Sequence, residues 1–275
     1  MRVLFLLLFG LWLPLSGTAQ KKSSDACLQI VSWNIANLGQ SKDDDEIQFM
    51  AQILRRFDVV AIQEVVAGAA GPQAVARLAD ALNRTGSAWD YVVSPPTVGN
   101  GVERYAFLWK KHRVSLSGEA RLLDVLDPMM DREPFYAKFT FGTFSMGLVS
   151  FHAVPKSKDP AREIVHLSKI PALFPEDALI IMGDFNLPHH EKAFLGLREK
   201  DMDAALRKVR TTLKMEPDPT TGERRANAYD NLFFEQKELR VDSAGAIDFS
   251  YSFPTLKAAR LISDHLPVWG CFCVK

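Results

Sequence analysis

The sequence predicts a single α/β or α+β domain over residues 20–275. Apolar runs of strand length alternate with amphipathic runs of helical spacing, and no linker or repeat interrupts them. Of the 275 residues, 47% are hydrophobic, which suffices for a large core and excludes a disordered chain. The 33 basic residues balance the 33 acidic ones, so any polyanionic substrate must be held by local chemistry and not by a strongly basic surface.

The predicted strands are rich in β-branched and aromatic residues and are bounded by Gly, Pro or Asp. They cover residues 28–35, 59–65, 89–94, 103–110, 135–141, 144–152, 178–185, 229–235 and 266–274. Chemically active side chains recur at or just past the ends of these runs, which is where an α/β scaffold presents a site.

Four helices are predicted between the strands. The first follows the acidic run 43–46, which suits the positive end of a helix dipole, and has apolar residues at helical spacing. The second covers residues 72–86. The third has Asp159 as its N-cap and Pro160 in its first turn, and is expected to stop at Pro171. A shorter fourth covers residues 191–200.

Residues 1–19 have the pattern of a secretory signal peptide. Arg2 precedes an uncharged, mostly apolar run, and small residues at Gly17 and Ala19 indicate cleavage after Ala19. The run is shorter than the roughly 20 residues that a membrane-spanning helix needs. The alternatives are an uncleaved anchor or a buried first strand. We therefore expect a secreted or periplasmic protein without membrane insertion.

The three cysteines lie at the two ends of this predicted mature chain. Cys27 opens the first predicted strand, and Cys271 and Cys273 share one face of the last. Because disulfides persist outside the cytosol, Cys27 could pair with either of them if the strands are neighbours. Three buried thiols are the alternative.

Carboxylates and amides at strand ends indicate a metal site. Glu64 and Asp184 close two apolar runs, where a carboxylate is costly unless it is paired or binds a metal. Together with Asn34, Asn186 and Asp264 they form an all-oxygen donor set. Such a set suits Mg²⁺ or Ca²⁺ better than zinc.

Two of the six histidines have the context of catalytic residues. His152 and His265 close or follow apolar runs, and Glu103 and Asp230 are plausible partners that would orient the rings and raise their pKa values. Two such pairs would let one imidazole take a proton from water while the other protonates a leaving oxygen. The other four, His112, His166, His189 and His190, are interpreted as surface or helix residues.

The motifs that carry these residues resemble the endonuclease/exonuclease/phosphatase superfamily, and within it the deoxyribonuclease I-like branch. The resemblance rests on Trp-Asn-Ile at 33–35, Ile-Gln-Glu-Val at 62–65, Glu-Arg-Tyr-Ala-Phe at 103–107, Asp-Arg-Glu-Pro at 131–134, Phe-His-Ala-Val-Pro at 151–155, Gly-Asp-Phe-Asn at 183–186, Ala-Tyr-Asp at 228–230, Ile-Asp-Phe at 247–249 and Ser-Asp-His-Leu-Pro-Val at 263–268. Motif order and spacing match over nearly the whole predicted mature chain. His152 and the string at 103–107 point to this branch.

The resemblance implies a four-layer α/β (α+β) sandwich, with two packed mixed β-sheets flanked by helices, and metal-dependent phosphodiester hydrolysis. The implied cofactor is Mg²⁺, with Ca²⁺ or Mn²⁺ as alternatives. Glu64 would bind the metal with help from Asn34 and Asp264, while Asp184 and Asn186 would hold the scissile phosphate and a second ion or the attacking water. The catalytic base and acid would be His265 with Asp230 and His152 with Glu103, in either order. Residues implied to lie near the phosphates are Tyr105, Arg132 and Tyr229.

The chain departs from this family at positions that contact duplex DNA in animal members. Where those members place Arg or Tyr, this sequence has Ala36, Val66, Gly101 and Asn231. Such side chains supply much of the affinity for nucleic acid, so the resemblance does not extend to a preference for duplexes. Basic clusters that flank the motifs could substitute as phosphate contacts, namely Lys156, Lys158, Arg162, Arg224 and Arg225. Ordinary solvated surface charges are the alternative.

These observations predict a monomeric, exported, metal-dependent endonuclease that acts on nucleic acid, with DNA as the expected substrate. The alternative within the superfamily is another phosphoesterase, of the sphingomyelinase or inositol-phosphate phosphatase type. A catalytically inactive binding module is a third reading, but it predicts broken motifs, and every motif residue is present.

Overall fold

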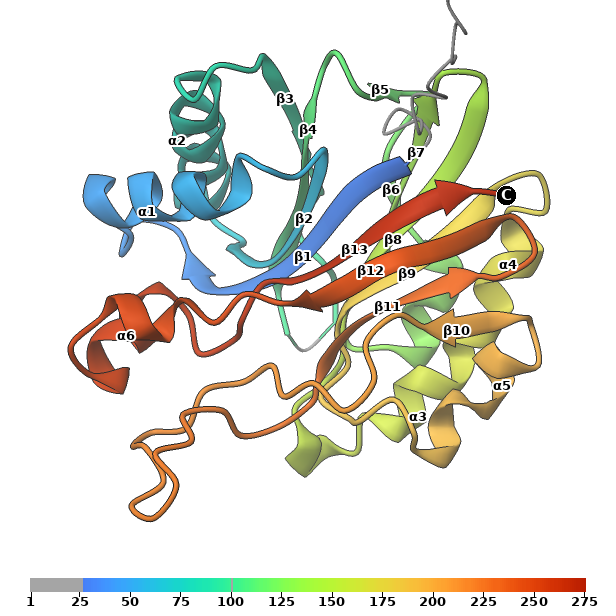
Figure 1. Cartoon of the computed structure of the whole chain (residues 1–275). Coiled ribbons are helices and arrows are strands. Elements are labelled where there is room, and N and C mark those ends of the chain that lie inside the picture. Colours follow the sequence, from blue (N-terminus) through green and yellow to red (C-terminus); the bar gives the residue numbers. More distant parts are fainter. Residues whose placement is uncertain (1–26, 100) are drawn as a thin grey trace, which may run out of the picture.

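The computed structural model describes residues 27–99 and 101–275, and it confirms the predicted sandwich. Two β-sheets pack face to face, and helices cover the outer face of each (Figure 1). The predicted signal peptide at residues 1–19 lies outside the described residues. Within the described ranges, no helix is long and apolar enough to span a bilayer.

The first sheet has six strands in the order β12-β13-β1-β2-β4-β3. β1 and β2 are parallel, and the other neighbours are antiparallel. The strands are β1 (Cys27–Leu38), β2 (Val59–Val66), β3 (Trp89–Val93), β4 (Glu103–Lys110), β12 (Leu239–Ala246) and β13 (Val268–Val274).

The second sheet has the order β10-β11-β9-β8-β7-β5, and β6 also pairs with β7. Its only parallel pair among the described strands is β8 with β9. The strands are β5 (Ser115–Leu116), β6 (Arg121–Leu122), β7 (Phe135–Phe141), β8 (Phe144–His152), β9 (Ala178–Asp184), β10 (Met202–Ala204) and β11 (Asp230–Glu235).

Helices close the two outer faces. Those on the first sheet are α1 (Asp44–Leu54), α2 (Ala70–Asn83) and α6 (Leu256–Ile262), and those on the second are α3 (Ala161–Ile164), α4 (Ile170–Leu173) and α5 (Leu195–Arg198). The 3₁₀ segments are η2 (Asp124–Met129), η3 (Lys156–Lys158), η4 (Val165–Lys169), η5 (Lys192–Phe194) and η6 (Phe249–Ser252).

Three hydrophobic clusters correspond to the three interfaces between the four layers. The central one joins the inner faces of the two sheets and includes Ile30, Phe107 and Leu148. The other two pack α1, α2 and α6 on the first sheet and the α3–α5 region on the second. Because each sheet is apolar on both faces, its central strands are rigid supports for whatever lies at their ends.

The first predicted helix is confirmed, and its start has the cause that the sequence suggested. The Asp43 side chain accepts a hydrogen bond from the Glu46 amide, and the Glu46 carboxylate accepts one from the Asp43 amide, which is a capping box.

The third predicted helix is present as a helical run, but its predicted N-cap and its predicted stop are wrong. Asp159 has left-handed backbone (φ 56°) and ends the turn η3 instead of capping a helix. Pro160 is the residue before α3, and the helix breaks into 3₁₀ geometry before restarting at α4, with Pro171 inside its first turn. Proline is tolerated at such a position because the first helical amides have no intrahelical acceptor.

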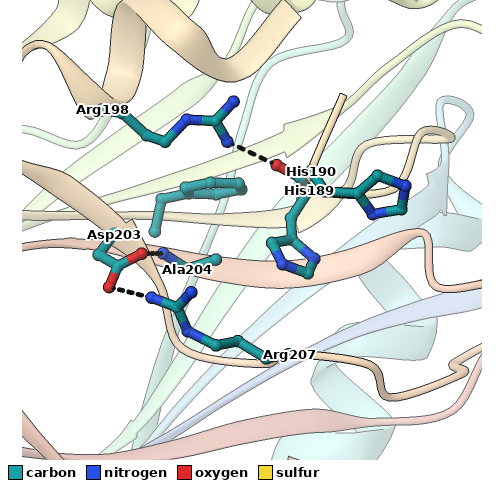
Figure 2. Close-up of a pocket in the computed structure, with 7 residues that line it drawn as sticks. His189, His190, Arg198, Asp203, Ala204 and Arg207 are labelled. Atoms are coloured by element: carbon teal, nitrogen blue, oxygen red, sulfur yellow. Dashed lines mark hydrogen bonds and ion pairs between the residues drawn. The ribbon is translucent and has the colours of Figure 1, made fainter. Parts of the chain in front are cut away.

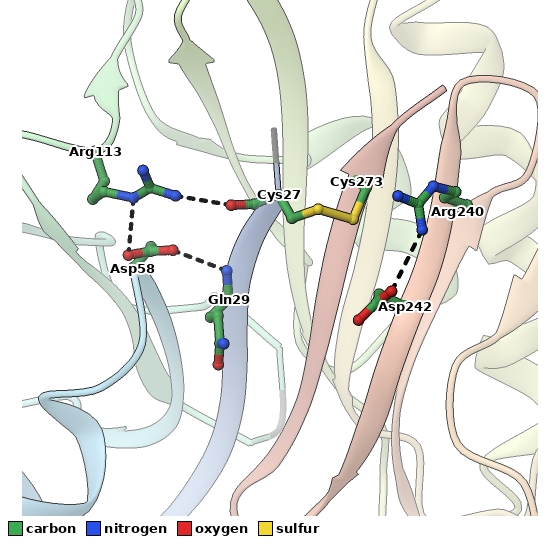
Figure 3. The surroundings of a disulfide bond; sticks show 7 residues. All are labelled: Cys27, Gln29, Asp58, Arg113, Arg240, Asp242 and Cys273. Atoms are coloured by element: carbon green, nitrogen blue, oxygen red, sulfur yellow. Dashed lines mark hydrogen bonds and ion pairs between the residues drawn. A yellow bond between two sulfur atoms is a disulfide. The ribbon is translucent and has the colours of Figure 1, made fainter. Parts of the chain in front are cut away.

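The structure joins Cys27 to Cys273 (Figure 3). Cys271 is a free thiol. The two bonded residues face each other in the antiparallel register of β1 and β13. Beside them, the Arg113 side chain donates to the Cys27 carbonyl and to Asp58. The described chain is therefore closed covalently between its first strand and its last.

Candidate active site

The predicted chemical residues meet at one edge of the sandwich because the strands that carry them end there. In the second sheet, Asp184 lies opposite His152 across the parallel pair β8–β9 and opposite Asp230 across β9–β11. In the first sheet, the parallel strands β1 and β2 bring Asn34 and Glu64 to the same edge, where β4 begins at Glu103.

A cleft of about 460 Å³ opens at this edge, which is within the usual size range of ligand sites. It is lined by Asn37, Glu64, Val65, Val66, Ala67, Gly68, Gly101, Val102, Glu103, Arg132 and His152. Its lining combines carboxylates and an imidazole with small apolar side chains.

His152 is held by Glu103, as the sequence predicted. Its Nδ1 lies 2.9 and 3.0 Å from the two carboxylate oxygens of Glu103, and both residues are buried. Burial lowers the pKa of His152, but the charge of Glu103 and the hydrogen bond to it outweigh burial, so the pKa is raised. The Nε2 atom is left to face the cleft.

His265 is held in the same way by Asp230. Its Nδ1 lies 3.0 and 2.9 Å from the carboxylate oxygens of Asp230. Burial lowers the pKa of His265, but the negative charges of Asp230 and Asp184 reverse this effect and raise the pKa to about 10. Thr211 was missed by sequence reasoning, yet its hydroxyl donates to Asp230 at 2.6 Å.

Asp184 lies between the two histidines. Its Oδ2 is 3.5 Å from Nε2 of His152 and 3.6 Å from Nε2 of His265. Asn186 fixes the other oxygen of Asp184, because its backbone amide donates a hydrogen bond to Oδ1 at 2.9 Å. Each imidazole is therefore held through Nδ1 by its own carboxylate partner, and the Nε2 atoms of both rings point toward Asp184.

The oxygen donors beside Asp184 fit a hard divalent cation. The Asn34 side-chain amide donates to Glu64 at 3.0 Å and to Asp184 at 3.2 Å, so one residue positions both carboxylates. The Asn34 Oδ1 atom is buried without a hydrogen-bond partner among the described residues. A buried acceptor without a donor is costly unless a cation fills that role.

Glu64 is also held in an unusual backbone conformation. Its φ is 59°, in the left-handed region that residues with a side chain rarely adopt, and its carboxylate accepts from the Asn37 amide. Two other predicted metal residues lie nearby but are differently engaged. Asp264 is half-buried and paired with Arg260 at 3.2 Å, and Asn186 donates to the Ala153 carbonyl.

Asp184, Asp230 and His265 also bring one possible ligand atom each within 4.8 Å of one another. Asp230 already accepts hydrogen bonds from His265 and Thr211, so its carboxylate is used to hold the histidine and is a poor candidate for a metal ligand. The oxygens around Asn34 and Glu64 are the better metal donors because they have acceptor capacity left.

The residues predicted to contact the substrate differ in their exposure. Tyr229 is half-buried beside Asp184, and burial together with the Asp184 charge raises its pKa. Tyr105 is a wrong prediction, because its side chain is 0% exposed and its ring stacks on Phe135 in the central core. A phenol enclosed in this way has no path to a substrate.

Arg132 lines the cleft, but its guanidinium is already engaged. Its Nε lies 3.0 Å from Glu103 Oε2, and its Nη1 donates to the carbonyls of His152 and Ala153. These bonds brace the Glu103–His152 pair, and a contact between Arg132 and phosphate stays a prediction.

The predicted phosphate-gripping clusters are also partly neutralised. Arg162 pairs with Asp131 at 2.7 Å, and Arg225 pairs with Glu223 at 2.9 Å. Lys156 and Lys158 are exposed on η3, the turn that follows His152. Arg224 lies against the ring of Tyr251.

His189 and His190 lie on a separate hollow of about 270 Å³ (Figure 2). Arg198 donates to the His189 carbonyl there, and Arg207 pairs with Asp203. Burial and the neighbouring cations lower the pKa of His189. These contacts agree with the interpretation of both histidines as residues outside the catalytic set.

A two-sheet sandwich with two histidine–carboxylate pairs and an oxygen-rich donor set defines a hydrolase of phosphate esters. Residues 31–265 match the model of the Endonuclease/Exonuclease/phosphatase family, and the chain belongs to that family, in its deoxyribonuclease I-like branch. Enzymes of this branch depend on a divalent metal ion.

Two curated relatives carry the resemblance over most of their length. The chain is 32% identical to a deoxyribonuclease of Thioalkalivibrio sp. (strain K90mix) over 269 residues, covering 90% of this chain and 71% of the relative. It is 30% identical to deoxyribonuclease-1 of Equus caballus over 284 residues, covering 95% and 96%.

Solved structures agree on the fold. Humanized D. rerio TDP2 superposes with a TM-score of 0.65 at 18% identity, covering 90% of this chain and 99% of that one. An endonuclease/exonuclease/phosphatase family protein from Bacteroides thetaiotaomicron gives 0.64 at 15% identity, covering 90% and 98%. At such identities the likeness speaks for the architecture alone.

Proposed function

We propose that this chain is an exported, Mg²⁺-dependent endonuclease that hydrolyses DNA. The observation that carries the proposal is the convergence of two carboxylate-held imidazoles on Asp184, at 3.5 and 3.6 Å. The names of the two curated relatives, both deoxyribonucleases, support DNA as the substrate.

The two histidine pairs divide the proton transfers of the reaction. Each carboxylate accepts from Nδ1 of its histidine, which leaves Nε2 to exchange protons in the cleft. One imidazole takes a proton from the attacking water, and the other, as imidazolium, gives a proton to the leaving oxygen. The raised pKa values favour the protonated form that the acid needs.

The residues that would hold Mg²⁺ are Glu64 and Asn34, with Asp264 on the same edge, while Asp184 and Asn186 would orient the phosphate or the water. When bound, the ion supplies positive charge to the phosphate oxygens as the reaction proceeds. Ca²⁺ or Mn²⁺ could serve the same oxygen ligands. Tyr229 would contact the phosphate from the side of Asp184.

Export is part of the proposal. The signal-peptide pattern at residues 1–19 supports it, as does a Cys27–Cys273 bridge, because disulfides persist in oxidising compartments. We expect the mature protein to act as a monomer. Amino-terminal sequencing of the protein recovered from the periplasm or medium tests the cleavage, which is expected after Ala19.

A substrate panel tests the activity. The purified protein is incubated with plasmid, single-stranded DNA, RNA, sphingomyelin and an inositol phosphate, in Mg²⁺ or in EDTA. We expect cleavage of DNA in Mg²⁺ and none in EDTA. Cleavage of the lipid or the inositol phosphate alone would overturn the proposal in favour of another phosphoesterase, and no cleavage of any substrate would indicate an inactive binding module.

Metal binding is tested separately from turnover. Mg²⁺ should raise the melting temperature of the wild type, because a ligand that binds only the folded state stabilises it. The Asn34→Ala and Glu64→Gln variants should lose most of this shift. Lys156→Ala, an exposed change beside the cleft, is the control and should keep it. Equal shifts in all four proteins would contradict the assigned ligands.

A further inference from the structure

An exposed aromatic ring with a cation on one face lies close to the catalytic edge. Tyr251 on η6 is 68% exposed, which is unusual for so large an aromatic side chain. The Arg224 guanidinium carbon lies 4.5 Å from the centroid of its ring, at cation–π distance. We call these two residues the Tyr251–Arg224 stack.

Hydrogen bonds to Ser250 and the burial of Phe249 hold the stack in place. Arg224 donates to the Ser250 carbonyl at 2.8 Å, and Asp248 accepts from both the amide and the hydroxyl of Ser250. Phe249, the residue before Ser250, is buried in the outer core. The ring of Tyr251 is therefore presented on a fixed backbone, which reduces the entropy lost when a ligand stacks on it.

Two independent series of contacts connect the segments that carry the stack to His265. Thr212 forms a β-bridge with His265, and the next residue, Leu213, forms one with Arg225, the neighbour of Arg224. On the other side, the Trp33 indole donates to the His265 carbonyl and packs on Phe249, with ring centroids 5.4 Å apart. Each member of the stack is thus within a few residues of a direct contact to the catalytic histidine.

The segment that carries Arg224 is positively charged. Residues 207–225 contain six basic and three acidic side chains, in a chain that is neutral as a whole. In Figure 1 this long connection between β10 and β11 extends from the lower edge of the sandwich. A cationic segment with an exposed ring has the composition of a surface that follows a phosphate backbone and stacks its bases.

We propose that the Tyr251–Arg224 stack binds an unpaired base of the strand being cut, and so favours single-stranded or locally unpaired DNA. The inference rests on the proposed deoxyribonuclease activity and names its substrate class. Only an unpaired base can offer its face to Tyr251, because the bases of a duplex are stacked on one another. Stacking of this kind does not depend on base identity, so weak sequence preference is expected.

The test compares Tyr251→Ala with Tyr251→Phe on a single-stranded oligonucleotide and on the matching duplex. The Tyr251→Ala variant should raise KM for the single strand about tenfold or more, with kcat little changed, because it loses ground-state binding. The Tyr251→Phe variant keeps the ring and should behave like the wild type. Tyr91→Ala, at a half-exposed tyrosine on the outer strand β3, is the matched control.

A binding measurement supplies a readout that does not need turnover. In EDTA, the fluorescence anisotropy of a labelled single strand should show weaker binding by Tyr251→Ala and by Arg224→Ala, and unchanged binding by Tyr91→Ala. Circular dichroism verifies the fold of each variant, and all these side chains are at least partly exposed.

The outcomes separate this inference from the proposed function. A wild type that cuts no DNA would overturn the proposed function. A wild type that cuts DNA while Tyr251→Ala keeps the wild-type KM and affinity for the single strand would overturn the stack alone. Equal losses on single strand and duplex would also overturn it, because they would indicate a phosphate contact and not a base contact.

Discussion

The hydroxyl of Thr211 connects the polypeptide backbone to the His265–Asp230 pair. It donates to Asp230 at 2.6 Å and accepts from the amides of Tyr229 and Asp230. Burial raises the pKa of Asp230 to about 6, so this carboxylate needs its hydrogen bonds to stay ionised. The orientation of the His265 ring therefore depends on a residue that is 0% exposed and never faces the cleft.

We expect Thr211→Val to lower kcat about tenfold, since a lost hydrogen bond to a buried charged group costs about 1–3 kcal/mol. Thr211→Ser keeps the hydroxyl and should restore most of the rate. Steady-state kinetics of both variants check the prediction. A valine variant as fast as the serine variant would mean that Asp230 does not depend on this bond.

Some residues of the site could be predicted from the sequence, and others could not. The partners Glu103 and Asp230 were predicted because strand ends and family motifs place them near the histidines, and in the structure each carboxylate is hydrogen-bonded to its histidine ring. Thr211 is 19 residues before Asp230, in a long connection without a local signal. Tyr105 was misassigned because a motif residue on a strand can face either side, and here it faces the core.

At the scale of elements, Gly183 is what allows β9 to reach the active-site edge. Its φ is +145°, and a Cβ there would lie 1.8 Å from the Phe151 carbonyl oxygen on β8. The strands can only approach so closely if one residue has no side chain. This approach sets the register that places Asp184 opposite His152.

We expect Gly183→Ala to reduce the free energy of unfolding by more than about 3 kcal/mol, because backbone must move to admit the methyl group. The matched control is Gly222→Ala, which also has positive φ but has nothing within 4 Å of the added carbon. It should lose only about 1 kcal/mol. Urea unfolding measures both, and similar losses would show that the close approach is relaxed at little cost.

The disulfide connects the two terminal strands of the described chain. Its residues are 246 positions apart, so the bond restricts a very long loop of the unfolded chain. Replacing Cys273 by Ser should therefore reduce the free energy of unfolding by about 2–4 kcal/mol. Cys271→Ser removes the free thiol. This variant should keep the free energy of unfolding of the wild type, and reductant should lower that free energy as much as it does in the wild type. A Cys273→Ser variant as stable as the wild type in oxidising buffer would contradict the pairing.

Sequence reasoning predicted the central strands well and the periphery poorly. The central strands are long apolar runs, buried on both faces, and such runs are visible without a structure. β12 was missed because Leu239–Ala246 lies at the edge of its sheet and is mostly half-buried or exposed, without a run of buried apolar residues. α6 was missed because a helix of seven residues has too few turns to show a periodic pattern.

At the scale of the whole molecule, the balance of charge is compatible with a polyanionic substrate. The acids are concentrated where the strands end, and a divalent ion at Glu64 and Asn34 would reverse the local sign. The basic residues of 207–225 lie on a connection beside the same edge. The four-layer arrangement itself followed from the family resemblance, since alternating elements alone allow several α/β architectures.

The central claim is that His152 and His265 act as one catalytic unit around Asp184. Its most direct test is the rate of cleavage of a DNA oligonucleotide in Mg²⁺ by the wild type, His152→Ala, His265→Ala and the double variant, with His112→Ala as the exposed control. Each single variant should lose about 10²–10⁴-fold in kcat with its fold retained. The double variant should lose far less than the product of the two, because residues that act together are not additive. A single variant within tenfold of the wild type, or fully multiplicative losses, would contradict the claim.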